Sequence, residues 1–207
     1  MHFTFHSSFA IVALALLLTS CSESFTDSRD GQSYDVVKIG NLTWMAENLN
    51  FETAGSFCPE GDSRNCKRLG RLYSWAEARS VCLEGWRLPT KEDFESLVAA
   101  QSSSQSRAGA KLKAKDGWFK KGNCSDALGL RALPAGYRGA ISKADDCTIS
   151  GGNFDGIGGY AYFWSATEDA ENPESNEYYL FLSFSSDAAS LNAFAKDDYR
   201  SVRCVKP

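Results

Sequence analysis

The chain has 207 residues, with 22 Lys and Arg against 26 Asp and Glu, a net charge of −4 and 43% hydrophobic residues. This acidic balance argues against a dedicated nucleic-acid binder, which needs a basic face. The hydrophobic content is enough for a folded core, which excludes a chain that is disordered throughout.

The N-terminus carries the pattern of a lipoprotein signal. Residues 9–18 (FAIVALALLL) form an apolar run of 10 residues, whereas a membrane-spanning helix takes about 20. The run ends in Leu18-Thr19-Ser20-Cys21, which resembles a bacterial lipobox, although residues 1–8 contain no Lys or Arg. We expect residues 1–20 to be removed and Cys21 to be acylated. The alternative is an ordinary secretion signal with an incidental cysteine.

Cleavage at this point would also remove the only two histidines, His2 and His6. The mature chain would then have no Ser-His-Asp or Cys-His catalysis and no zinc site that needs an imidazole. Residues 21–30 are polar, so we expect the lipidated cysteine and a short tether there, followed by one folded domain over residues 31–207.

The six remaining cysteines predict disulfides in an exported chain, with 15 pairings to choose from. The segment between Cys58 and Cys66 has loop composition throughout, which favours a local bridge. Cys82 lies near the end of a predicted helix and Cys204 in a predicted last strand. If these two are joined, Cys124 pairs with Cys147 by elimination. The sequence contains no CxxC pair.

The predicted elements indicate an α+β domain. Alternating patterns predict a hairpin over 34–39 and 42–45, then strands over 160–165, 177–184 and 202–205. Helical spacing predicts one helix over 72–82, ended by Gly85, and a second that begins after Thr90 as N-cap with Asp93 at N3. The Ser-rich residues 101–109 predict a mobile loop. The 177–184 run is apolar on both faces, as expected of a buried central strand.

Six motifs in order carry a family resemblance: YDVVKIGNLTWMAENLNF, GRLYSWAEARSVC, GWRLPTKEDFESL, ALPAGYR, YFWSATE and a closing SVRCV. Together they resemble the Fibrobacter succinogenes major paralogous domain from about Gly31 to Val205. The resemblance implies a C-type-lectin-like fold, with two helices flanking a small, mostly antiparallel sheet. It also implies a bridge from the first helix to the last strand, which supports Cys82–Cys204. Such domains occur in surface lipoproteins of fibre-degrading bacteria, and polysaccharide adhesion has been proposed for them.

The GWRLPT segment is also similar to part of the formylglycine-generating enzyme family. That family needs a reactive cysteine pair near its C-terminal region, whereas the only late cysteine here is Cys204, which serves better as a staple. A thiol enzyme also needs an exposed cysteine of low pKa beside a cation. We therefore expect no catalytic residue, with a cysteine-dependent oxidase as the weaker alternative.

An acidic loop over residues 168–177 is the one weak candidate for calcium, which lectin-like folds use to hold sugars. It offers the oxygen ligands that Ca²⁺ prefers, from Glu168, Glu171, Asn172, Glu174 and Asn176. The calcium triplets of lectins, Glu-Pro-Asn and Trp-Asn-Asp, are both absent. We therefore expect a solvated acidic turn and no cofactor, and we keep calcium as the alternative.

Aromatic side chains are the other route to a polysaccharide, because pyranose rings stack their apolar faces on Trp and Tyr. Some candidates combine an aromatic ring with nearby cations, and others lie in turns before the last strand. They are Trp118, Phe119, Tyr137, Arg138, Asn192, Lys196, Asp197 and Tyr199.

These observations predict a lipid-anchored, disulfide-stapled, non-catalytic adhesion module at the bacterial outer membrane. The expected partner is a plant-type polysaccharide, with no nucleic acid and with membrane contact only through the lipid. The alternative is a structural or protein-binding component of the envelope.

Overall fold

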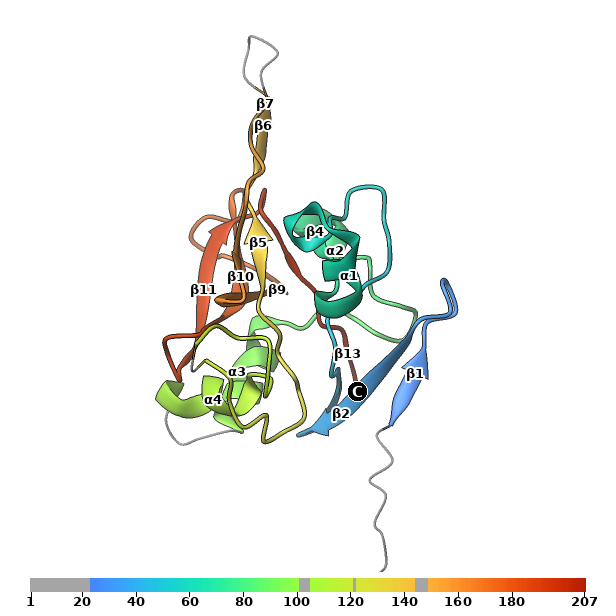
Figure 1. Ribbon diagram of the computed structural model, residues 1–207, viewed down its shortest axis with the longest axis vertical. Helices are drawn as coiled ribbons and strands as arrows, with labels where there is room; N and C mark the ends of the chain where they lie inside the picture. Colours follow the sequence, from blue (N-terminus) through green and yellow to red (C-terminus); the bar gives the residue numbers. More distant parts are fainter. Residues whose placement is uncertain (1–22, 101–104, 121, 144–148) are drawn as a thin grey trace, which may run out of the picture.

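The computed structural model describes residues 23–100, 105–120, 122–143 and 149–207. Figure 1 shows a mixed α+β fold in which short helices lie around sheets of mostly antiparallel strands, so the predicted α+β class is confirmed. The expected signal, residues 1–20, and Cys21 lie outside the described residues. Within the described ranges, no helix is long and apolar enough to cross a membrane.

The first sheet joins the two ends of the domain. Its strand order is β1-β2-β3-β13, and the strands are β1 (Ser24–Thr26), β2 (Ser33–Ile39), β3 (Leu42–Met45) and β13 (Val205–Lys206). The predicted hairpin is confirmed, with Ile39 opposite Leu42 and Val36 opposite Met45. Gly40 has a φ of 62° in its turn, where glycine is favoured. Because β13 pairs with β3, the C-terminus lies beside the N-terminal strands (Figure 1).

The tether expected over residues 21–30 is wrong from Ser24 onward, because this segment is part of the folded domain. β1 pairs with β2. The ring centroid of Phe25 lies 4.5 Å from that of Trp86 and 5.5 Å from that of Tyr34. Asp27 is buried and forms an ion pair with Arg29 at 2.6 Å. The ring contacts of Phe25 and the ion pair of buried Asp27 hold this short polar strand at the edge of the sheet.

The largest sheet has seven strands in the order β11-β10-β9-β12-β5-β8, with β4 also paired to β12. The strands are β4 (Leu72–Ser74), β5 (Ala135–Arg138), β8 (Phe154–Ile157), β9 (Tyr160–Glu168), β10 (Asn176–Ser183), β11 (Ala189–Ala195) and β12 (Tyr199–Ser201). The two predicted β runs are confirmed as β9 and β10. A separate hairpin of β6 (Ile141–Lys143) and β7 (Ile149–Gly151) extends away from β5 (Figure 1).

The strand predicted over 202–205 is wrong, because the chain changes sheets there. β12 ends at Ser201 in the seven-stranded sheet, and β13 begins at Val205 in the first sheet. Arg203 is buried between them, and its guanidinium donates to Asn48 Oδ1 at 2.7 Å and to backbone carbonyls that include Met45 O at 3.0 Å. The apolar pattern of this segment reflects burial at the junction of two sheets.

The helices are short. They are the 3₁₀ turns η1 (Pro59–Gly61) and η2 (Gln105–Arg107) and the helices α1 (Ser63–Leu69), α2 (Trp75–Ala78), α3 (Lys91–Ala99) and α4 (Ala108–Leu112). The expectation of only two flanking helices is therefore wrong. The helix predicted over 72–82 is also wrong, because Leu72 and Tyr73 are buried in β4 opposite β12, which leaves four helical residues in α2.

The second predicted helix is confirmed as α3. Thr90 and Asp93 form a capping box, in which each side chain accepts the backbone N–H of the other. Phe94, Leu97 and Val98 are buried on one face of this helix. Of the predicted loop over 101–109, residues 101–104 lie outside the described ranges. From residue 105 onward the prediction is wrong, because η2 and α4 form there.

A close backbone approach holds α4 against the turn before β11. A Cβ added at Gly109 would lie 2.3 Å from the carbonyl oxygen of Ala188, so only glycine lets α4 come so near the turn before β11. Ala110 N donates to Asp187 O at 3.1 Å across that contact.

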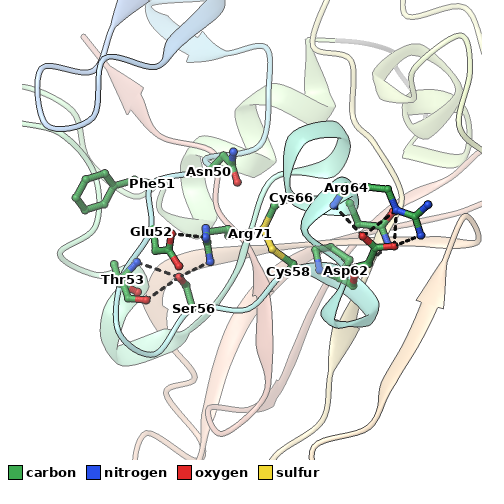
Figure 2. Close-up of a disulfide and its surroundings, with 12 residues drawn as sticks. Asn50, Phe51, Glu52, Thr53, Ser56, Cys58, Asp62, Arg64, Cys66 and Arg71 are labelled. Atoms are coloured by element: carbon green, nitrogen blue, oxygen red, sulfur yellow. Dashed lines mark hydrogen bonds and ion pairs between the residues drawn. A yellow bond between two sulfur atoms is a disulfide. The ribbon is translucent and has the colours of Figure 1, made fainter.

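Two of the three predicted disulfides are confirmed, Cys58–Cys66 and Cys82–Cys204. The first joins η1 to α1, beside the N-cap Asp62 (Figure 2). The second closes a separation of 122 residues, which on the chain-entropy model stabilises the fold by roughly 4–5 kcal/mol. Cys124 forms no disulfide with any described residue, and its Sγ lies 3.4 Å from Gly122 O. Its predicted partner, Cys147, lies outside the described residues.

Candidate ligand-binding surface

Strand register decides how the two predicted Tyr-Arg pairs are arranged. In the antiparallel pairing of β12 with β5, Tyr199 stands opposite Arg138. Neighbouring residues of a strand point to opposite faces. Tyr199 and Arg138 therefore share one face of the sheet, and Tyr137 shares the other face with Arg200.

On the first face, the Arg138 guanidinium is enclosed by aromatic rings. Its Cζ lies 3.7 Å from the ring centroid of Phe57 and 5.6 Å from that of Tyr199. Nε donates to Gly152 O at 2.8 Å, while Nη1 is buried without a partner among the described residues. This arrangement is a packed cation–π cluster that joins β5 to the loop before η1.

On the second face, a continuous set of aromatic rings crosses three strands. Neighbouring ring centroids lie between 5.1 and 6.4 Å apart. We call this set the aromatic ribbon; its members are Phe119, Tyr137, Tyr160, Tyr162, Tyr179, Phe181 and Phe184. Phe119 is 54% exposed, and the other members are half-buried.

The members of the ribbon on β10 lie on the face opposite the main core, whereas Phe184, which follows this strand, also packs against that core. On β10, Leu180 and Leu182 are fully buried in the core cluster that contains Phe94 and Leu97 of α3, whereas Tyr179 and Phe181 alternate with them. Asn192 of β11 stands opposite Tyr179 and is exposed. The structure thus brings three of the predicted candidates, Phe119, Tyr137 and Asn192, to one surface.

A buried arginine stiffens the middle of this surface. The Cζ of Arg200 lies 4.1 Å from the ring centroid of Tyr179 and 4.2 Å from that of Trp164. Nη2 donates to Asp198 Oδ2 at 2.8 Å, whereas Nε and Nη1 have no partner among the described residues. Burial raises the pKa of Tyr162, so its phenol stays neutral at physiological pH.

Three other candidates line an open cavity of about 420 Å³ at the start of β12, together with Trp75. They are Lys196, Asp197 and Tyr199. Asp197 is exposed, whereas Lys196 is engaged by the protein. The Nζ of Lys196 lies 3.0 Å from Glu177 Oε1 and 3.9 Å from Glu168 Oε1, donates to Pro173 O, and lies 4.7 Å from the Trp75 ring centroid.

The partner of this lysine, Glu177, is a fully buried carboxylate. Burial raises its pKa to about 7, and the hydrogen bond from Lys196 only partly offsets that effect. The pair joins β10 to the segment that follows β11 and so fixes one wall of the cavity.

The prediction that Trp118 contacts ligand at the surface is wrong, because this side chain is buried. It is only 5% exposed, and its indole N–H donates to Ala132 O at 3.0 Å. Lys113, also buried, donates to Ser183 O and Ser186 O and lies 5.4 Å from the same ring. The adjacent Phe119, by contrast, is exposed.

The acidic loop over 168–177 is organised by hydrogen bonds around buried Asp169. This carboxylate accepts from Glu171 N at 3.2 Å and from the side-chain amides of Asn172 and Asn176 at 3.5 and 3.4 Å. The remaining calcium candidates are Glu168, in its ion pair with Lys196, and Glu174, which is exposed. Over the described part of the chain, no group of three or more His, Cys, Asp or Glu residues could hold a metal ion.

Sequence reasoning missed five members of the ribbon: Tyr160, Tyr162, Tyr179, Phe181 and Phe184. Their signal was present as aromatic residues at every second position of residues 160–162 and 179–181. Because the residues between these aromatics are also apolar, the run over 177–184 was predicted to be a strand buried on both faces.

Comparison with known proteins gives one match. The family model described as the Fibrobacter succinogenes major domain matches residues 37–206. No curated protein and no solved structure matches the chain. The match spans most of the chain, from β2 through β13, and it confirms the resemblance carried by the six motifs. The chain therefore belongs to the Fibrobacter succinogenes major domain family.

Proposed function

We propose that this chain is a non-catalytic, lipid-anchored module of the bacterial outer surface that binds plant-type polysaccharide through the aromatic ribbon. The observation that carries the proposal is the continuity of the ribbon, in which each ring contacts the next from Phe119 to Tyr179. Aromatic faces stack on the apolar faces of pyranose rings, and polar neighbours such as Asn192 bind hydroxyls. An extended row of rings suits a linear polymer better than a single sugar.

The compartment part of the proposal rests on the lipobox-like Leu-Thr-Ser-Cys sequence and on the two disulfides, because disulfides persist in exported proteins. We also propose a C-type-lectin-like arrangement, in which Cys82–Cys204 is the bridge between the segment after α2 and the C-terminal segment.

The test is a pull-down on insoluble cellulose, xylan and chitin, with calcium and with chelator. The protein is the oxidised chain from residue 22 onward, which contains every element of the structure. We expect chelator-resistant binding that is lost in the Tyr160→Ala/Phe181→Ala variant. Binding abolished by chelator would instead favour the acidic loop as a calcium site.

The matched control is Tyr178→Ala. Tyr178 is a half-buried tyrosine on the same strand as Tyr179, but it faces Lys91 of α3 on the other side of the sheet. Retained binding in this control and lost binding in the ribbon variant, both with unchanged unfolding midpoints, would support the proposal. If a folded wild-type chain bound none of the three polymers, polysaccharide adhesion would be rejected in favour of a protein partner, for which Phe119 and Phe194 supply exposed apolar contacts.

A further inference from the structure

A cavity of about 280 Å³, lined by both polar and apolar groups, lies apart from the ribbon and shares no residue with it. It is bounded by the start of β2, by the segment after β3, and by the last turn of α1 beside the Cys58–Cys66 disulfide. Its size is near the lower end of the range for ligand pockets, about 300–1,000 Å³. Such a volume suits one small ring rather than a polymer segment.

One wall of the cavity is a fixed hydrogen-bond network. Asn50 N donates to Tyr34 Oη at 3.0 Å, Tyr34 Oη donates to Gln32 Oε1 at 3.3 Å, and Asn50 Nδ2 donates to the same oxygen at 3.0 Å. Tyr34 is buried and burial raises its pKa, so it remains a neutral donor. The polar groups of this wall are therefore ordered before any ligand arrives.

One acceptor in the network is left over. Asn50 Oδ1 is buried and has no hydrogen-bond partner among the described residues. Figure 2 shows this oxygen on the side of Asn50 that faces Cys66, and both residues line the cavity. A buried acceptor without a partner costs stability until a donor reaches it. Because this oxygen is closed to solvent, a ligand hydroxyl would supply that donor after a rotation of the Asn50 side chain.

The opposite wall is positively charged. Lys67 and Arg68 line the cavity from the last turn of α1, and both are exposed. No described carboxylate forms an ion pair with either; Arg68 donates only to Asn65 Oδ1, at 3.3 Å. The one acidic lining residue, Glu47, is already engaged, since it lies 3.4 Å from Arg131 and accepts from Asp35 N at 3.0 Å. The unmatched charge of the cavity is therefore positive.

We propose that this cavity binds a carboxylated sugar ring, a hexuronic acid, with Lys67 and Arg68 on the carboxylate and Asn50 Oδ1 accepting from a ring hydroxyl. A neutral sugar would leave the two cations unused, and a simple anion would leave Asn50 unpaired. The site is independent of the ribbon, so it would add selectivity for acidic sugars to the proposed adhesion.

The test is isothermal titration calorimetry of the oxidised chain from residue 22 onward with galacturonic and glucuronic acid, and with galactose and glucose as neutral counterparts. We expect the acids to bind and the neutral sugars to bind at least about tenfold more weakly, as loss of a charge-assisted contact implies. The uronic acid could be one ring of a polymer or a free sugar acid, and a trimer of galacturonic acid distinguishes these two sources. Binding equal to that of the monomer indicates one ring of a polymer in the cavity, and loss of binding indicates a free sugar acid.

The decisive variant is Lys67→Gln/Arg68→Gln, and its matched control is Lys38→Gln/Arg64→Gln. The control removes the same charge from exposed positions outside the cavity, one of them on the same helix. We expect uronate affinity to fall about tenfold or more in the first variant only, and Asn50→Ala to weaken it with unchanged affinity for acetate.

Several results would overturn the proposal: no uronate binding by a folded chain, equal binding of neutral sugars, an equal loss in both double variants, or equal competition by acetate. The Tyr160→Ala/Phe181→Ala variant keeps the two proposals separate. It should lose polymer binding through the ribbon but keep uronate affinity in the cavity. Failure of polymer binding in the wild type would therefore leave the cavity result intact.

Discussion

The two faces of the seven-stranded sheet are made by the same strands but have different chemistry. On the inner face, Leu180 and Leu182 of β10 are fully buried against α3 and its neighbours. On the outer face, Tyr179 and Phe181 of the same strand are half-buried and contact neighbouring rings, and Tyr179 also packs against Arg200 and a second core cluster that contains Trp164. A strand that is apolar at every position can therefore serve a core and a binding surface at once, because alternate side chains lie on opposite faces.

The largest expected effect comes from the arginine beneath the outer face. Replacing Arg200 with Met leaves Asp198 buried without its ion-pair partner, which we expect to cost about 3–5 kcal/mol in the free energy of unfolding. Urea denaturation measures it. The double variant Asp198→Asn/Arg200→Met should recover most of the loss, and a single variant as stable as the wild type would show that the rings need no charged support.

Adjacent positions of β10 give the direct comparison of the two faces. Leu180→Ala leaves a cavity in the core and should cost about 2–5 kcal/mol. Phe181→Ala removes a half-exposed ring and should cost only about 1–2 kcal/mol, while it weakens polymer binding. Chemical denaturation of both variants checks the stabilities. Equal costs would mean that the outer face is packed as a core and does not serve as a surface.

The two most exposed phenylalanines sharpen the comparison further. Phe119 is 54% exposed and contacts the ribbon through Phe184, whereas Phe194 is 58% exposed and has no ring contact in the described structure. Phe119→Ala should weaken polymer binding by about threefold to tenfold, the worth of one stacked ring. Phe194→Ala is the comparison variant and should cost less affinity, because Phe194 lies on the same face as Asn192 but contacts no ring of the ribbon. Equal losses in both variants would indicate nonspecific apolar adsorption.

The last comparison concerns a pH dependence at the edge of the outer face. Because the pKa of Glu177 rises from 4.5 to about 7 on folding, the folded state binds its proton more tightly than the unfolded state. Its contribution to stability is complete below about pH 4.5 and is lost as the pH rises toward 7. Glu177→Gln should flatten this part of the stability profile, measured as denaturation midpoints from pH 4.5 to 7.5.

The control for this titration is Glu168→Gln, since Glu168 shares the cation Lys196 but is exposed. This variant should keep most of the wild-type decline, because burial raises the pKa of Glu177 more than the charge of Glu168 does. A decline of the same slope in Glu177→Gln would assign the pH dependence to other groups.

Local sequence determined the elements whose signals are short-range. The hairpin over 34–45 follows from alternation around Gly40, and α3 follows from the capping box of Thr90 and Asp93. The bridge Cys58–Cys66 was predicted by the loop between its cysteines, and the family by six motifs in order. These features need no information from distant parts of the chain.

Tertiary structure alone decided the rest, because it depends on pairings between distant segments. Leu72 and Tyr73 are in a strand and not in the predicted helix, because β12, more than a hundred residues away in the sequence, pairs with them. The indole of Trp118 is buried in the core, and Lys196 is paired with Glu177. The sequence around both residues is nevertheless typical of a binding site. The alternation of side chains along β9 and β10 was visible in the sequence. A repeat of two residues, however, does not show which face of the sheet other elements cover. That choice was made by α3 and its neighbours packing on one side, which left the aromatic ribbon on the other.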